Sequence, residues 1–238
     1  MLQQLEILYK CAILSKTSLF FMSLMIALPC HGGIVNEKTT MSLFKLGKLL
    51  ARSNIPHGLL TQANSSLITQ GRSKCVSFFM NNTDHEYLFF LDSDIGFDEY
   101  DVLKLINHQV DIVSGAYPMK TIPIRYCINV IQPEQRKGDL LKIEGNGMGF
   151  TLIHRNVFLQ MAQKFPDLKY TPPKDDSNVP PTEAEINNSY HFFMEHKKGD
   201  GFLSEDKSFF FRASMLGYDI WLDTTIKLQH VGSHVFSE

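Results

Sequence analysis

One stretch decides the fold: Tyr87-Leu88-Phe89-Phe90-Leu91-Asp92-Ser93-Asp94, in which an apolar run leads directly into two carboxylates. A short apolar run this rich in aromatic residues is typical of a strand that is buried on both faces of a parallel sheet. Side chains two residues apart on an extended chain point the same way, so Asp92 and Asp94 are expected to converge where the strand ends. Open α/β sheets bind their ligands at the carboxyl ends of strands. The stretch therefore predicts an α/β fold with a site at this point.

Two carboxylates at the end of a strand offer hard oxygen ligands, which suit Mg²⁺ or Mn²⁺. A metal ion held there would in turn bind phosphate oxygens. The alternative is structural, with one carboxylate capping the next helix and the other solvated. The Asp-x-Asp pattern is common, so by itself it does not choose between these interpretations.

Apolar runs alternate with helical patterns on both sides of this strand, which is typical of an α/β fold with a mostly parallel central sheet flanked by helices. Further strands are expected at residues 21–28, 57–60, 110–113, 150–153 and 218–222, and helices at 39–53, 66–80, 99–108, 156–164 and 205–216. Gly217 is expected to end the last of these helices. The polar, proline-containing segment 171–190 shows no pattern and is interpreted as a lid or a disordered stretch.

The composition excludes some classes of protein. The chain has 238 residues, 23 basic and 25 acidic, with a net charge of −2, and no stretch is basic enough to indicate nucleic-acid binding. Its cysteines show no paired spacing, which favours reduced thiols in a cytoplasmic protein, or in the host cytoplasm if the source is viral. These cysteines are Cys11, Cys30, Cys75 and Cys127.

The apolar stretch at residues 18–29 has two interpretations. It is too short to span a bilayer, so no transmembrane span is expected. It could be the apolar part of a signal peptide, but no small-x-small cleavage site follows it. We prefer to interpret it as the first strand of the fold, preceded by an N-terminal extension at residues 1–16.

Four features follow one another along the chain: Asp92-Ser93-Asp94, a glycine-rich loop at residues 145–149, Ser204-Glu205-Asp206 at a helix start, and His230. Their order and spacing resemble the nucleotide-sugar glycosyltransferases of the GT-A fold, which share an Asp-x-Asp motif, a glycine-rich loop, an x-Glu-Asp motif and a C-terminal histidine. The resemblance covers about residues 22–232 and includes compact viral and bacterial members. It implies one GT-A (Rossmann-like) domain at residues 17–238, with a nucleotide-binding part at about 17–115 and an acceptor-binding part at about 116–238.

The resemblance implies a metal-dependent transfer of a sugar from a nucleoside-diphosphate sugar, with a UDP-sugar favoured, to a hydroxyl of a glycan or another acceptor. Asp94 and His230 would hold the metal, which would neutralise charge on the departing diphosphate as a Lewis acid. Asp92 would reach the ribose hydroxyls or the metal. An imidazole ligand favours Mn²⁺ over Mg²⁺, because it is softer than a carboxylate. His234 could replace His230, and a histidine at a strand end can also simply bond to backbone.

Inverting transfer needs a carboxylate on the acceptor side to take the proton of the attacking hydroxyl. The resemblance assigns this role to Asp206, with Glu205 holding hydroxyls of the acceptor or the sugar. Alternatively, both carboxylates only complement the dipole of the helix that they begin.

The donor would be held by several further residues. Pro29 would lie near the base, and the planar guanidinium of Arg72 could pair with a phosphate or a base carbonyl, or form a surface salt bridge instead. Glycines let a backbone approach a ligand, so the loop is a candidate donor contact, or otherwise a tight turn. Tyr117 and Trp221 could stack on a sugar, although core packing is favoured for Trp221. The donor-binding candidates are Pro29, Arg72, Asp92, Ser93, Asn146, Gly147 and Met148.

Two other functions compete with this interpretation. In a phosphatase of the haloacid-dehalogenase kind, Asp92 would be the nucleophile and Asp94 the acid-base, but that motif lies near the start of its core and not in mid-chain. The other is a nucleotide-sugar binding protein without catalysis. In the favoured interpretation, residues 171–190, together with Glu195 and His196, would form an acceptor lid.

Overall fold

The computed structural model describes residues 22–174, 178–232 and 235–237. The expected N-terminal extension, Cys11 and His234 lie outside these residues. Among the described helices, none is long and apolar enough to cross a membrane. The described cysteines are free thiols, with Cys30 and Cys75 buried and Cys127 exposed.

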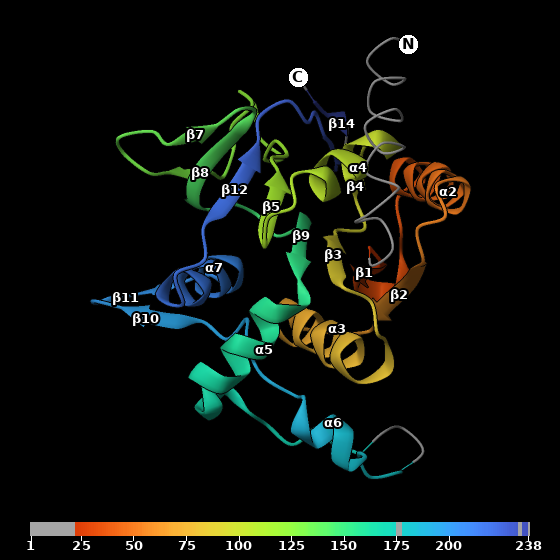
Figure 1. The fold of residues 1–238 in the computed structure, drawn as a ribbon, viewed down its shortest axis with the longest axis vertical. Coiled ribbons are helices and arrows are strands. Elements are labelled where there is room, and N and C mark those ends of the chain that lie inside the picture. Colours follow the sequence, from red (N-terminus) through yellow and green to blue (C-terminus); the bar gives the residue numbers. More distant parts are fainter. Residues whose placement is uncertain (1–21, 175–177, 233–234, 238) are drawn as a thin grey trace.

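A nine-stranded sheet forms the centre of the molecule (Figure 1). Most of its strands run in one direction, while β9 lies antiparallel between β3 and β5, and β8 lies antiparallel to β12. Helices flank the sheet, so the predicted α/β fold class is confirmed. The strand order is β2 (His57–Ala63), β1 (Leu24–Cys30), β3 (Tyr87–Leu91), β9 (Phe150–His154), β5 (Ile112–Gly115), β12 (Ile220–Asp223), β8 (Leu140–Gly145) and β6 (Asn129–Val130), with β7 (Arg136–Lys137) paired to β8.

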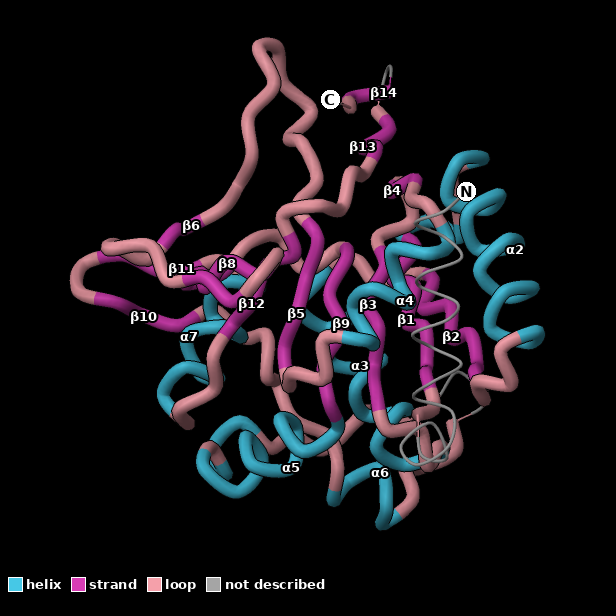
Figure 2. The backbone as a smooth tube through the Cα atoms, turned by 45° about the horizontal axis from the view of Figure 1, so that its top comes forward, coloured by secondary structure: helices cyan, strands magenta, loops and turns pink. Residues whose placement is uncertain are grey.

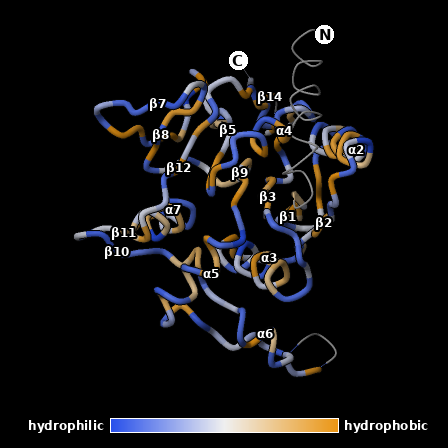
Figure 3. The backbone as a smooth tube through the Cα atoms, in the orientation of Figure 1, coloured by the Kyte–Doolittle hydropathy of each residue, from blue (hydrophilic) through white to orange (hydrophobic). Residues whose placement is uncertain are grey.

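Alternate residues of each central strand point to opposite faces of the sheet, so both faces present apolar side chains. Helices cover both of these faces. Phe89 and Leu91 of β3 pack with α2 (Glu37–Arg52) and α4 (Glu99–Asn107). Leu88 and Phe90 point to the second face of the sheet and pack with the helices that cover it. Figure 3 shows hydrophobic segments along the central strands and more hydrophilic loops around them. The helices on this second face are α3 (Ile68–Asn82), α5 (Arg155–Lys164) and α7 (Glu205–Met215).

A small second sheet carries the C-terminal histidine to the end of β3. It pairs β4 (Ile95–Gly96) with β13 (Gln229–Val231), and β13 with β14 (Val235–Phe236). His230 is the register partner of Ile95, and the Val231 amide donates to the Asp94 carbonyl at 2.9 Å. Residues more than a hundred positions apart in the sequence are thereby fixed side by side.

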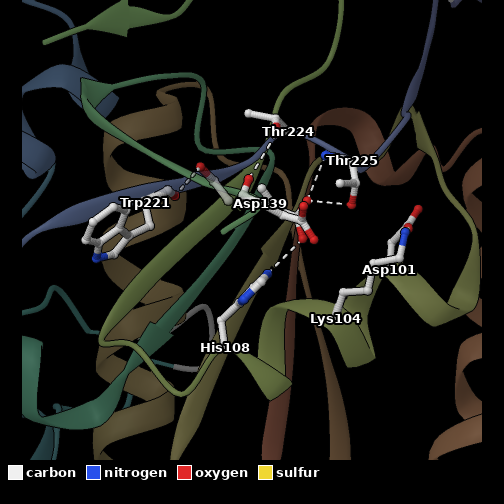
Figure 4. Close-up of polar contacts among 9 residues, drawn as sticks. Asp101, Lys104, His108, Asp139, Trp221, Thr224 and Thr225 are labelled. Carbon is white, nitrogen blue, oxygen red and sulfur yellow. Dashed lines mark hydrogen bonds and ion pairs between the residues drawn. The ribbon is translucent and has the colours of Figure 1, made fainter. Parts of the chain in front are cut away.

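A buried carboxylate shapes the turn that follows β12 and leads toward β13 (Figure 4). Asp223 is 2% exposed and accepts hydrogen bonds from the Thr225 amide at 2.8 Å and the Thr225 hydroxyl at 2.7 Å. Its second oxygen lies 2.8 Å from His108 Nε2. Burial alone would raise the pKa of Asp223, but the bonds from His108 and Thr225 hold it below its usual value.

The element boundaries differ from the expected ones at two informative places. The first strand continues through Pro29 and Cys30, so Pro29 lies inside β1 rather than after it. Proline is tolerated there because the pairing of β1 with β3 stops at Ala27. The segment 171–190, for which no regular structure is expected from the sequence, contains the short helix α6 (Glu183–Asn187). This helix begins with a capping box between Thr182 and Glu185.

Several short elements connect or extend the larger ones. The 3-10 turn η2 (His31–Gly33) follows β1. The strands β10 (His196–Lys198) and β11 (Gly201–Leu203) form a hairpin that projects beside α7 (Figure 1). A second 3-10 turn, η3 (Pro166–Leu168), follows α5.

Candidate functional site

The Asp-x-Asp motif, Glu205 and His230 line one cavity of about 490 Å³ at the carboxyl end of β3, which we call the main cavity. It lies where ligands of open α/β sheets bind, and its volume is within the range of small-molecule sites. The sequence-predicted residues that line it are Pro29, Arg72, Asp92, Ser93, Asp94, Glu205 and His230.

A smaller cavity of about 230 Å³ shares His230 with the main cavity; we call it the side cavity. Tyr117, Lys120, Asn146 and Gly147 also line it. The loop between β5 and β6, which carries Tyr117 and Lys120, extends beyond the edge of the sheet toward β13 (Figure 2).

Asp92 is held from two sides. One oxygen accepts a hydrogen bond from Arg72 Nη2 at 3.0 Å, and the other accepts from the Tyr117 hydroxyl at 3.4 Å. This hydroxyl in turn accepts from the Gly149 amide at 3.2 Å. A Cβ at Gly149 would collide with the Asp92 carboxylate, and one at Gly147 would collide with the Tyr117 hydroxyl. The glycines of this loop therefore let the side chains of Asp92 and Tyr117 approach its backbone closely.

Arg72 is the buried cation of the site, with a side chain that is 4% exposed. Burial alone would lower the pKa of its guanidinium, but the charge of Asp92, followed by Tyr117 and Glu205, raises the pKa above its usual value. Among the described residues, no hydrogen-bond partner reaches its Nε or Nη1. Buried donors are costly when left unpaired, so Arg72 depends on its ion pair with Asp92 and on the Phe90 ring beneath its guanidinium.

Asp94 is the second carboxylate of the motif and is surrounded by cations. Its Oδ2 lies 2.5 Å from Lys120 Nζ and 3.5 Å from His230 Nε2. Burial alone would raise the pKa of Asp94, but the bonds to His230 and Lys120 lower it below its usual value. Sequence reasoning missed Lys120, because nothing in the spacing of the loop marks one lysine as a partner of Asp94.

The residues around Asp94 fit a divalent cation. His230 Nδ1 lies 2.8 Å from the Pro118 carbonyl, which can only accept, so Nδ1 donates to it. Nε2 faces Asp94 Oδ2 at 3.5 Å, and a carboxylate with an imidazole is a ligand combination that ions such as Mn²⁺ accept. In the described part of the chain, no group of three or more His, Cys, Asp or Glu side chains could hold a metal.

The two carboxylates at the start of α7 have different surroundings. Glu205 lines the main cavity, and its pKa is raised by burial and then by the nearby charge of Asp206. One oxygen of Asp206 accepts from the Lys207 amide at 2.8 Å and from the Ser204 hydroxyl, so it also stabilises the helix start. Asp206 does not line the main or the side cavity, although its charge contributes to the raised pKa of Tyr117 in the side cavity.

Two further candidates from the sequence, like Asp206, line neither of these cavities. Met148 belongs to the glycine-rich loop, but it is fully buried in the hydrophobic core, so the expected contact with a ligand is not available to its side chain. Trp221 packs against the other core cluster, in agreement with the favoured interpretation of this residue.

Among solved structures, the chain is similar to A197 from STIV, with a TM-score of 0.50 and 21% identity over 89% of this chain and 86% of that chain. The likeness is one of fold. Other matches are a glycosyltransferase involved in the glycosylation of the major capsid of PBCV-1 (TM-score 0.34, 12% identity, 63% of this chain and 68% of that chain) and HddC from Yersinia pseudotuberculosis (TM-score 0.34, 8% identity, 56% of this chain and 77% of that chain). Both are too distant to carry an argument. No protein-family model and no curated protein matches the chain.

Proposed function

We propose that this protein is a metal-dependent glycosyltransferase that moves a sugar from a nucleoside-diphosphate sugar to an acceptor hydroxyl. One observation carries the proposal: the Asp-x-Asp pair lines a single cavity at the carboxyl end of β3 together with Glu205 and His230, which lie more than a hundred residues further along the chain. Such convergence of carboxylates and an imidazole is what transfer from a diphosphate requires.

The main cavity is the proposed donor site. Arg72 lines this cavity, and its guanidinium would donate to a phosphate or base oxygen. Pro29 and Ser93 line the same cavity and would contact the nucleotide. A uridine nucleotide remains the favoured donor.

Asp94 and His230 are the proposed ligands of the cation, with Mn²⁺ favoured by the imidazole. When bound, this ion would neutralise the charge that develops on the diphosphate as the sugar leaves. Asp92 is already engaged by Arg72 and Tyr117, so its proposed role is to orient Arg72 and to reach the ribose. The same engagement disfavours a phosphatase, in which Asp92 would have to act as a free nucleophile.

Asp206 is the proposed base, and Glu205 is proposed to hold hydroxyls of the donor sugar. The difference between their surroundings supports this division, because Glu205 lines the donor cavity and Asp206 does not. A base must act from the acceptor side of the reacting carbon. A third cavity of about 600 Å³ is lined by Lys207, Phe211 and Ser214 of α7, and it is the proposed entrance for the acceptor.

A donor screen tests this function. The protein is incubated with UDP-, GDP- and CMP-sugars in the presence of Mn²⁺, and nucleotide release is measured for the wild type and Asp94→Asn. Slow hydrolysis of one donor class by the wild type, and its loss in the variant, is expected. Release of phosphate from a phosphomonoester, without hydrolysis of any sugar donor, would instead identify a phosphatase.

A further inference from the structure

Lys120 occupies a position that sequence motifs do not assign. Its ammonium lies 2.5 Å from Asp94 Oδ2, the oxygen that also faces His230 Nε2 at 3.5 Å. Lys120 therefore stands next to the oxygen that the proposed divalent cation needs.

The lysine is held in this position by the segment that carries the histidine. A Cβ at Gly232 would lie 3.0 Å from Lys120 Cδ, so the aliphatic part of the lysine packs closely on the chain just after His230. The loop of Lys120 is tied to the same place, since the Pro118 carbonyl bonds to His230 Nδ1 at 2.8 Å. The Lys120 and Asp94 side chains are 39% and 32% exposed, so the ion pair is partly open to solvent while its position is fixed by these packing contacts.

A divalent cation bound to Asp94 Oδ2 would compete with this ammonium. Mg²⁺ and ions of similar size bind carboxylate oxygens at about 2.1 Å, which would bring two positive centres close together on one oxygen. Lys120 would have to leave. Lys120 also lines the side cavity, and His230 lines both the side cavity and the main cavity. A displaced ammonium therefore stays next to the main cavity.

We propose that Lys120 is a tethered cation that competes with the divalent metal for Asp94 and binds the diphosphate of the donor once it is displaced. The inference rests on the proposed function. The consequence is cooperativity between the metal and the diphosphate. Metal alone binds weakly, because the ion pair between Lys120 and Asp94 must be broken and the ammonium gains no new partner. Metal and diphosphate bind well together, because the phosphate oxygens give the ammonium a new partner.

The test measures Mn²⁺ binding to the full chain by electron paramagnetic resonance of the free ion, with and without UDP. Lys120→Met removes the charge and keeps most of the aliphatic length, while Lys120→Arg keeps the charge. Lys45→Met, at an exposed position of α2, is the matched control. We expect Lys120→Met to bind Mn²⁺ alone about tenfold more tightly than the wild type, and UDP to enhance its Mn²⁺ affinity about tenfold less. Lys120→Arg and Lys45→Met should retain the coupling of the wild type.

Two results overturn the inference in distinguishable ways. If Lys120→Met has the Mn²⁺ affinity and the UDP coupling of the wild type, the role of Lys120 is wrong while the proposed function stands. If the folded wild type shows no Mn²⁺-linked binding of any nucleoside diphosphate, both the inference and the proposed function fail.

Discussion

The ion pair between Arg72 and Asp92 gives the sharpest prediction about stability. The Arg72 side chain is 4% exposed and the Asp92 side chain 24%, so removal of the carboxylate charge leaves a cation in the interior without compensation. Breaking a buried pair in this way costs about 3–5 kcal/mol, and partial exposure of Asp92 moves the expectation to about 2–3 kcal/mol. For a domain of this size, Asp92→Asn should lower the Tm by roughly 5–10 °C.

Substitution of Arg72, the other partner of the ion pair, should lower the free energy of unfolding by less. Arg72→Met replaces the buried cation by an apolar side chain of similar length, and the carboxylate that remains can turn toward water. In a double-mutant cycle followed by urea unfolding, Asp92→Asn should therefore destabilise more than Arg72→Met. In the presence of Arg72→Met, Asp92→Asn should cost little. Equal stability of Asp92→Asn and the wild type would refute the claim that Arg72 depends on Asp92.

Three further predictions concern the loop, the turn after β12 and the base. Gly149→Ala should abolish UDP binding in calorimetry because its Cβ would displace the Asp92 carboxylate, whereas Gly47→Ala, where a Cβ meets nothing within 4 Å, should bind normally; normal binding by both variants would contradict this. The pKa of Asp223 is lowered in the folded state, so its contribution to stability is present above the unfolded carboxyl pKa of about 4 and is lost as the pH falls through the lower folded value. As the pH falls through that acidic range, the free energy of unfolding of Asp223→Asn should consequently decrease less than that of the wild type. An equal decrease in both proteins would argue against the stabilising bonds of Asp223 with His108 and Thr225. Asp206→Asn should reduce the rate of sugar transfer at least about 100-fold with UDP affinity unchanged, and full transfer activity in this variant would exclude Asp206 as the base.

Much of the framework follows from the sequence because burial on both faces leaves a strong pattern. The run before Asp92 is the central strand β3, which ends at Leu91 directly before the Asp-x-Asp motif. The antiparallel direction of β9 could not be predicted, since an apolar run reads the same in either direction.

The site is less predictable, because it depends on contacts between short elements. The pairing of β13 with β4 brings His230 to Asp94, and strands of two or three residues leave no periodicity to detect. Lys120 lies on a loop with no regular pattern, so only the three-dimensional arrangement reveals its ion pair with Asp94. The capping box of α6, in contrast, could have been recognised as Thr182 followed three residues later by Glu185.

The measurement that tests the central claim most directly is calorimetric titration of UDP into the wild type with Mn²⁺, the wild type with EDTA, and Asp94→Asn with Mn²⁺. The proposed arrangement of Asp94 and His230 predicts binding in the first case and an affinity at least about tenfold weaker in the other two. Equal UDP affinity in all three titrations would contradict it, because the nucleotide would then be held without the cation that the site is proposed to bind.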